Sequence, residues 1–290
     1  MTMKPGSPQD TRLLHLRAAA QGVANTQPSH PAISAILVFG SVAHGQVDEF
    51  SDVDLLLACR SVVPPVAERR AILNEIGSGW QFDRQNEGSL FRVVDEDGHV
   101  AGVLVSVHYQ TVPWIDAVLD AVLERGAITT EQMPFRPYTV PALLQRAWVL
   151  LDRDGDVARW CEASRNYPSL LQANILRHFV PDLRTHVDEL KRTAERDLGA
   201  RNFIFFLNWA VDDLTSILLA LNGVYDLADR RMHTTVVPFL PYLPPGYVAA
   251  MTEVLEGPFD RQGARRRAQL FERLATDVLR KARGVLGADA

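Results

Sequence analysis

The sequence has few cysteines, no excess of basic residues and no long hydrophobic run. Its two cysteines, Cys59 and Cys161, are far apart and lack the spacing of a metal site. We therefore expect no disulfide framework, and a reduced, cytoplasmic protein. The formal net charge of −5 argues against a broad phosphate-binding surface, so a nucleic acid is not an expected partner.

A membrane span is not expected either. The most apolar segment, residues 203–223, is interrupted by Asn208, Asp212 and Asp213, whereas a membrane helix needs roughly 18 or more consecutive apolar residues. The first twelve residues contain no apolar core and so do not resemble a secretory signal.

The composition is that of a globular chain long enough for two domains. Hydrophobic residues make up 47% of its 290 residues and charged residues 22%, which is sufficient for a sizeable core. Residues 1–155 alternate between strand and helix patterns, and residues 156–290 read as helices. The predicted fold class is α+β, with a mixed sheet flanked by helices and then a C-terminal helical bundle.

Hydrophobic periodicity and turn residues place the elements within these two parts. The tetrad Asp95–Gly98, between two β-rich runs, predicts a hairpin turn. Residues 147–155 fit either a strand or a helix end. Strands are predicted at 32–39 and 53–59, and a first helix is predicted to start at residue 10. The other predicted helices are 64–77, 111–126, 157–163, 168–198, 200–221, 247–255 and 261–285. A proline-rich loop is predicted at 236–246.

A glycine turn and two acids stand out in residues 35–58. On a strand, Asp52 and Asp54 project from the same face, and Val53 projects from the opposite face. Two adjacent carboxylates repel each other, and a few hard oxygen ligands suit Mg²⁺ together with phosphate oxygens. Gly40 lets the backbone approach a ligand closely, and the Ser41 hydroxyl with the following amides can hold a phosphate.

This pattern resembles the signature of the nucleotidyltransferase superfamily with the polymerase-beta-type fold. That signature is an apolar residue, Gly-Ser, about ten residues and Asp-x-Asp, which Phe39 to Asp54 match in order and spacing. The strand-rich half followed by helices is also similar to kanamycin- and streptomycin-type antibiotic nucleotidyltransferases. The resemblance implies Mg²⁺ and ATP or another NTP, with residues 1–155 as the nucleotidyltransferase domain and 156–290 as the acceptor side. It implies metal binding and catalysis by Asp52 and Asp54, and nucleotide binding by Gly40, Ser41, Ser51 and His44, which replaces an arginine common in relatives.

The resemblance also implies a third acid on a neighbouring strand, where this chain has Ser106. Three explanations remain open. His108, two residues further on the same face, can act as the proton acceptor in catalysis. Glu87, Asp212, Asp213 or a dimer partner can supply the acid instead. The third explanation is a protein that binds nucleotide without catalysis.

The helical half carries Asn208, Asp212 and Asp213 on an otherwise apolar helix. This segment looks like the helix that contacts the acceptor in kanamycin-type enzymes, so the three residues are candidates for binding a polyhydroxylated or cationic acceptor. The alternative is a helix edge that contacts solvent or a neighbouring helix.

Other motifs have simpler explanations. Arg265–Arg267 are expected on a solvated helix face, and Trp80, Trp114 and Trp209 are expected in the core. The Asp152–Asp156 segment faintly resembles a calcium loop but lacks its downstream glutamate, and we interpret it as a turn.

The sequence therefore favours a Mg²⁺-dependent nucleotidyltransferase that acts on a hydroxyl of a small, aminoglycoside-like acceptor, as in antibiotic resistance. A monomer or a homodimer is compatible with the sequence. One alternative is a protein adenylyltransferase of the toxin–antitoxin type, and the other is a catalytically silent nucleotide-binding regulator.

Overall fold

The computed structural model describes residues 8–26, 30–85, 94–133, 135–227 and 232–287. It divides into two compact units. One contains Met1–Glu124 and Thr129–Asn166, and the other contains Arg125–Ile128 and Tyr167–Ala290. The first unit includes residues 156–166, which the sequence pattern assigns to the helical half.

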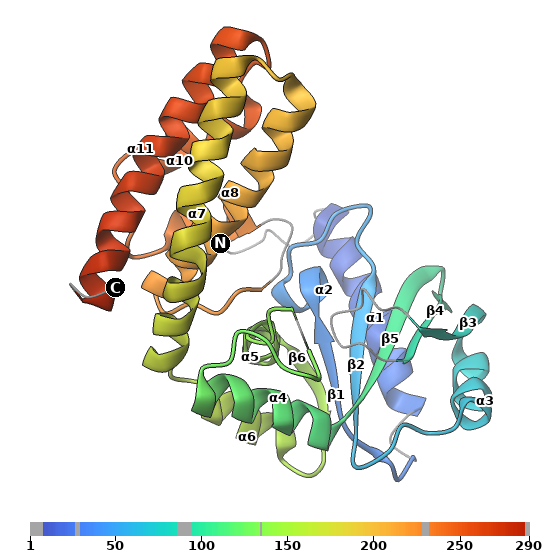
Figure 1. The fold of residues 1–290 in the computed structure, drawn as a ribbon. Helices are drawn as coiled ribbons and strands as arrows, with labels where there is room; N and C mark the ends of the chain where they lie inside the picture. Colours follow the sequence, from blue (N-terminus) through green and yellow to red (C-terminus); the bar gives the residue numbers. More distant parts are fainter. Residues whose placement is uncertain (1–7, 27–29, 86–93, 134, 228–231, 288–290) are drawn as a thin grey trace. The chain divides into compact units, whose positions relative to one another are not determined.

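The first unit is built on a six-stranded mixed sheet in the order β3-β4-β5-β2-β1-β6 (Figure 1). Neighbouring strands are antiparallel except β2 and β5, which run parallel. The strands are β1 (Ile33–Phe39), β2 (Val53–Cys59), β3 (Ser78–Gln85), β4 (Val94–Val100), β5 (Val103–Thr111) and β6 (Trp148–Asp152). The α+β class predicted from the sequence is confirmed, and residues 148–152 are a strand.

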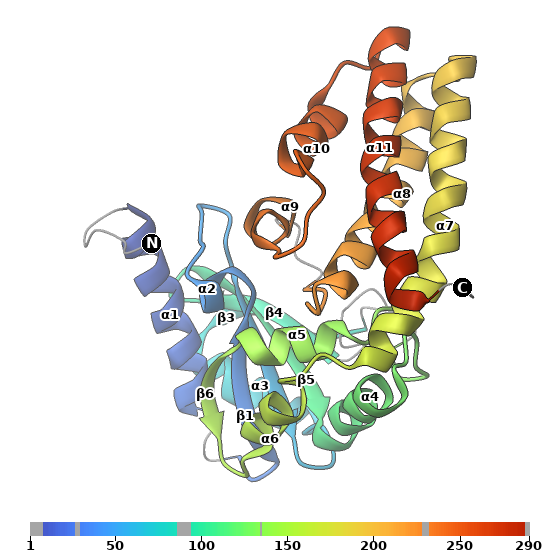
Figure 2. The same ribbon diagram turned by 90° about the vertical axis from the view of Figure 1, so that its left-hand side faces the viewer.

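Helices cover both faces of this sheet; Figure 2 shows α1 on one side and α4, α5 and α6 on the other. Leu16, Ala20 and Val23 of α1 pack against Val53, Leu55 and other residues of the central strands in one core. Thr111 accepts a hydrogen bond from the Trp114 amide, as expected of the residue before α4. The helices are α1 (Pro8–Thr26), α2 (Gly40–His44), α3 (Val66–Ile76), α4 (Val112–Arg125), α5 (Thr139–Arg146) and α6 (Asp156–Ala163).

The hairpin prediction is wrong about where the chain turns. Asp95–Gly98 lie inside β4, and the turn is Ala101–Gly102, with φ of 51° and 78°. Val100 pairs with Val103 across it, which is a two-residue hairpin loop. Positive φ at both central residues defines the type I′ turn, and Gly102 adopts it without strain. The four polar residues therefore belong to the sheet.

The second unit is helical, and α7, α8 and α11 pack on one another. The sequence pattern places its long helices to within three residues of their observed ends. Residues 237–239, inside the predicted proline-rich loop, form a short 3-10 helix. The elements are α7 (Ser169–Arg196), α8 (Ala200–Leu221), α9 (Met232–Thr235), η2 (Val237–Phe239), α10 (Tyr247–Glu256) and α11 (Arg261–Leu286).

Helix α8 is long and apolar enough to cross a membrane by length and composition alone. However, 61% of its most apolar window is buried inside the protein. This burial is typical of the core helix of a bundle.

Two predictions about exposure are wrong. Arg267 is 1% exposed, and it donates to the Val254 carbonyl near the end of α10 while stacking on Phe203 and Phe259. It satisfies carbonyls that a helix end leaves without partners. Trp209, in contrast, is 53% exposed and contacts Phe205 and His186 at the surface of α8.

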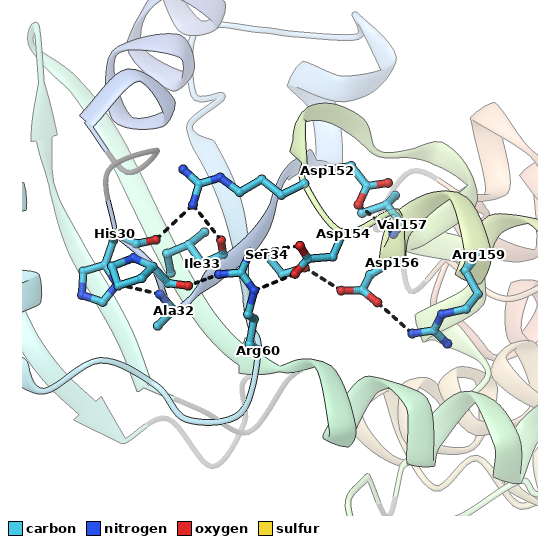
Figure 3. A network of polar contacts seen from close by, with 12 residues as sticks. His30, Ala32, Ile33, Ser34, Arg60, Asp152, Asp154, Asp156, Val157 and Arg159 are labelled. Atoms are coloured by element: carbon cyan, nitrogen blue, oxygen red, sulfur yellow. Dashed lines mark hydrogen bonds and ion pairs between the residues drawn. The ribbon is translucent and has the colours of Figure 1, made fainter.

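The Asp152–Asp156 segment joins the sheet to α6 (Figure 3). Asp152 accepts hydrogen bonds from the first amides of α6, Asp154 pairs with Arg60 at 2.7 Å, and Asp156 accepts a hydrogen bond from Ser34 at 2.5 Å. Each carboxylate therefore has a partner within the protein, which agrees with a structural turn.

Candidate functional site

Gly40 is the point at which β1 ends and α2 begins. Its φ is +69°, a conformation that residues with a side chain rarely adopt. A Cβ added to Gly40 would lie 3.2 Å from Oδ2 of Asp54. Any larger residue would thus be strained and would press on that carboxylate, so the glycine turn and the second acid of the motif are adjacent in space.

The five-residue helix α2 begins at the glycine. Ser41 and His44 are half-buried on it, and the helix ends at Gly45, which is also left-handed with φ of 69°. The Gln46 amide closes the turn by donating to the Ser41 carbonyl at 3.0 Å. The segment therefore has a compact, fixed backbone path from Gly40 to the loop before β2.

Ser51 and the two acids lie at the start of β2. Val53 and Leu55 are fully buried in the core, whereas the Asp54 side chain is 31% exposed on the opposite face. Asp52 comes just before the strand and is half-buried. The Ser51 hydroxyl donates to Asp48 and accepts from the Asp48 amide, both at 2.9 Å. Ser51 therefore shapes the loop that leads into the strand.

A row of polar side chains crosses three strands beside Asp54. Asp54 pairs in register with Ser106 of β5, and Ser106 pairs with Asp97 of β4. Residues paired across neighbouring strands project from the same face of a sheet. The Ser106 hydroxyl donates to Oδ1 of Asp97 at 2.7 Å. A carboxylate thus lies directly behind the serine, one strand further from Asp54.

His108 connects this row to a second acid of β4. Its Nδ1 lies 2.6 Å from Oδ1 of Asp95, its Nε2 lies 3.9 Å from Oδ1 of Asp54, and its ring packs on Phe39. Burial alone would lower the pKa of His108, but hydrogen bonds to Asp54 and Asp95 and their charges raise it to about 9. Beside these carboxylates the imidazole is protonated at neutral pH, which disfavours the predicted role of His108 as proton acceptor.

We call Asp54, Asp95, Asp97, Ser106 and His108 the polar face. Sequence reasoning missed Asp95 and Asp97 because it assigned them to a turn. The signal that could have found them is Ala101-Gly102, a two-residue loop between Val100 and Val103, which extends the strand back through both acids.

The orientation of β4 is fixed from the other side of the sheet. Glu96, between the two aspartates, is fully buried and lies 3.0 Å from Nε of Arg69 on α3. The Arg69 guanidinium also lies over the Tyr109 ring. Because side chains alternate along a strand, the burial of Glu96 directs Asp95 and Asp97 to the polar face.

The donor set suits a metal bound together with a phosphate. Among the residues that the structure describes, no three His, Cys, Asp or Glu side chains gather closely enough to hold a metal alone. Mg²⁺ is usually bound by one or two carboxylates, waters and substrate phosphates, and not by a cage of protein ligands. Asp52 and Asp54 are two carboxylates of the kind that such a site uses.

The predicted acceptor residues lie on α8 in the second unit. Asn208 and Asp212 are exposed. Asp213 is buried, with Oδ2 2.6 Å from Nδ1 of His186 on α7, and burial raises the pKa of this carboxyl to about 6. Asp213 therefore contacts a neighbouring helix, which is the alternative to acceptor binding that the sequence left open. Glu87 lies outside the described residues.

Neither a family model nor a curated protein matches this sequence. Among solved structures, the chain is similar to a nucleotidyltransferase-like protein from Exiguobacterium sibiricum 255-15. The two share 11% sequence identity, and the match covers 93% of this chain and 77% of the other, with a TM-score of 0.44. So distant a likeness adds nothing to the functional assignment.

Proposed function

We propose that this protein transfers a nucleoside monophosphate from an NTP, preferably ATP, to a hydroxyl group of a small molecule. The observation that carries the proposal is the approach of Gly40 to Asp54, with 3.2 Å between a Cβ at Gly40 and the carboxylate. The bend at Gly40 has no side chain, and the acid beside it is half-exposed. This leaves room for a polyphosphate next to the carboxylates that would bind the Mg²⁺. The match of Phe39 to Asp54 to the nucleotidyltransferase signature supports the same assignment.

In this proposal Asp52 and Asp54 hold one Mg²⁺ together with the triphosphate. When bound, the metal neutralises phosphate charge and so makes pyrophosphate a better leaving group. Gly40 and Ser41 hold the phosphates through backbone amides and the Ser41 hydroxyl. The chain thereby contributes positioning and charge neutralisation.

The polar face also provides a route for the acceptor proton. The acceptor oxygen forms a bond to the α-phosphorus, and the bond from that phosphorus to the pyrophosphate oxygen breaks. The acceptor proton passes to Oγ of Ser106, whose own proton passes to Asp97, 2.7 Å away. His108, 2.6 Å from Asp95 and 3.9 Å from Asp54, holds these two carboxylates in place.

The proposed acceptor is an aminoglycoside-like molecule. Asn208 and Asp212 are exposed on α8 and can bind hydroxyl and ammonium groups, respectively. Inactivation of an antibiotic is the biological role that this acceptor implies. Modification of a protein side chain and binding of nucleotide without catalysis are the competing functions.

Calorimetry with a nonhydrolysable ATP analogue tests the nucleotide site. We expect saturable binding with Mg²⁺ and at least tenfold weaker binding when EDTA removes the metal. Absence of binding under both conditions contradicts the proposed function. Pyrophosphate release from ATP, with an aminoglycoside panel or with water as acceptor, then separates a transferase from a silent nucleotide-binding protein.

Replacing Asp97 with Asn should lower kcat for pyrophosphate release by about a hundredfold, because general-base catalysis contributes at least that much. The affinity for the ATP analogue should not change, since Asp97 holds no phosphate. Adding Ser106→Asp to this variant should restore much of kcat, because it puts a carboxylate where the serine now stands. Glu75→Gln, an exposed change on α3, is the matched control. Equal kcat for the Asp97→Asn variant and the wild type would disprove the proton route.

A further inference from the structure

A pocket of about 560 Å³ lies in the second unit, between the C-terminal part of α11 and the segment that follows η2. Tyr242, Pro244 and Pro245 line one wall, and Arg280, Lys281 and Gly284 of α11 line the other. Its volume is within the range of sites that bind small organic molecules. The proposed function leaves this pocket without a role.

The wall that contains Tyr242 is held in a fixed position. The Asn222 side chain accepts a hydrogen bond from the Tyr242 amide at 2.7 Å and donates one to the Tyr242 carbonyl at 3.0 Å. The Tyr242 hydroxyl donates to the Asp277 carbonyl at 3.3 Å. Pro244 and Pro245 have fixed φ angles. These contacts hold the Tyr242 wall in place before any ligand binds.

The opposite wall carries a positive charge. Arg280 and Lys281 are cations, and the lining includes one carboxylate, Asp277, which lies 3.0 Å from Arg280. The Lys281 ammonium lies 5.5 Å from the centroid of the Tyr242 ring. The ammonium lies over the face of that ring, so the charged group of an anionic ligand can meet a cation beside Tyr242.

Gly284 opens the space between these walls. A glycine inside a helix is less favourable than an alanine at the same position. A Cβ at Gly284 would meet no atom of the described chain within 4 Å, so packing does not require the glycine. The absence of a side chain at Gly284 enlarges the pocket and lowers the stability of the helix.

From these features we propose that the pocket binds an organic anion with a planar ring, such as an aromatic phosphate or carboxylate. The ring lies against Tyr242 and Pro244, and the anionic group contacts Lys281 and Arg280. Gly284 leaves room for the body of the ligand. All residues that line this pocket belong to the second unit, whereas Asp54 of the proposed nucleotide site belongs to the first.

Calorimetry on the full chain with phenyl phosphate and with benzoate tests the proposal. We expect at least one of these probes to bind at least tenfold more tightly than both inorganic phosphate and benzyl alcohol, since each comparison molecule lacks either the ring or the charge. Saturating ATP analogue should leave this binding unchanged. If neither probe shows saturable binding, or if inorganic phosphate or benzyl alcohol binds as well as they do, the proposal is wrong.

Variants of α11 locate the binding. Gly284→Leu should raise Kd of the tighter probe at least tenfold by filling the pocket, and leucine favours the helix, so folding is preserved. The double variant Lys281→Gln with Arg280→Gln should reduce the affinity for the anionic probe to that for benzyl alcohol. Arg283→Gln removes an exposed cation from the same helix outside the pocket and should leave Kd unchanged. Equal Kd for the Gly284→Leu variant and the wild type would place the binding elsewhere.

Discussion

Replacing Asp54 with Asn is expected to remove the Mg²⁺ dependence of nucleotide binding and to raise Kd of the Mg²⁺–ATP analogue by about tenfold to a hundredfold. Even residues that only orient metal ligands contribute this much to metal affinity. The amide keeps the shape of the side chain beside Gly40, where the carboxylate lies 3.2 Å from a Cβ position, so the fold should persist. Calorimetry with and without Mg²⁺ measures the effect.

Asp52→Asn should produce the same loss, because the proposed metal uses both carboxylates. Asp120→Asn makes the same chemical change on an exposed position of α4 and serves as the control. If the Asp54→Asn variant binds the analogue as the wild type does, Asp54 is not a metal ligand and the assignment of the site fails.

Replacing Glu96 with Gln should lower the free energy of unfolding of the first unit by about 3–5 kcal/mol, because it removes the counter-charge of the buried Arg69 guanidinium. Arg69 is 4% exposed, and its Nε lies 3.0 Å from the Glu96 carboxylate. Water cannot replace the lost partner at this depth. Urea denaturation, followed by a probe in the sheet, measures the change.

A double variant separates the charge effect from a packing effect. Arg69→Met with Glu96→Leu should recover most of the stability, since an apolar pair of similar size often replaces a buried ion pair without loss. Asp154→Asn breaks the exposed pair with Arg60 and should have a far smaller effect than Glu96→Gln. A double variant as unstable as Glu96→Gln would show that shape, and not charge, explains the loss.

Local sequence patterns predicted the elements whose signals are local. The apolar periodicity of residues 200–221 gives the bounds of α8, and the spacing from Gly40 to Asp54 anticipates a bend beside an acid. Side chains whose environment depends on distant segments could not be predicted. The hydrogen bond between Asp97 and Ser106 joins two strands and has no signature in the polar tetrad that was interpreted as a turn. Arg267 looked solvated because the carbonyl that it binds belongs to α10.

The two-residue turn at Ala101–Gly102 limits how the length of this hairpin can vary during evolution. Deleting a single residue there would remove the two-residue loop and shift the pairing of Val100 with Val103 by one position. Asp95 and Asp97 would then rotate toward the core, and Glu96 would leave Arg69. Homologues that use these acids should therefore keep a loop that preserves this pairing, or carry a bulge that restores it.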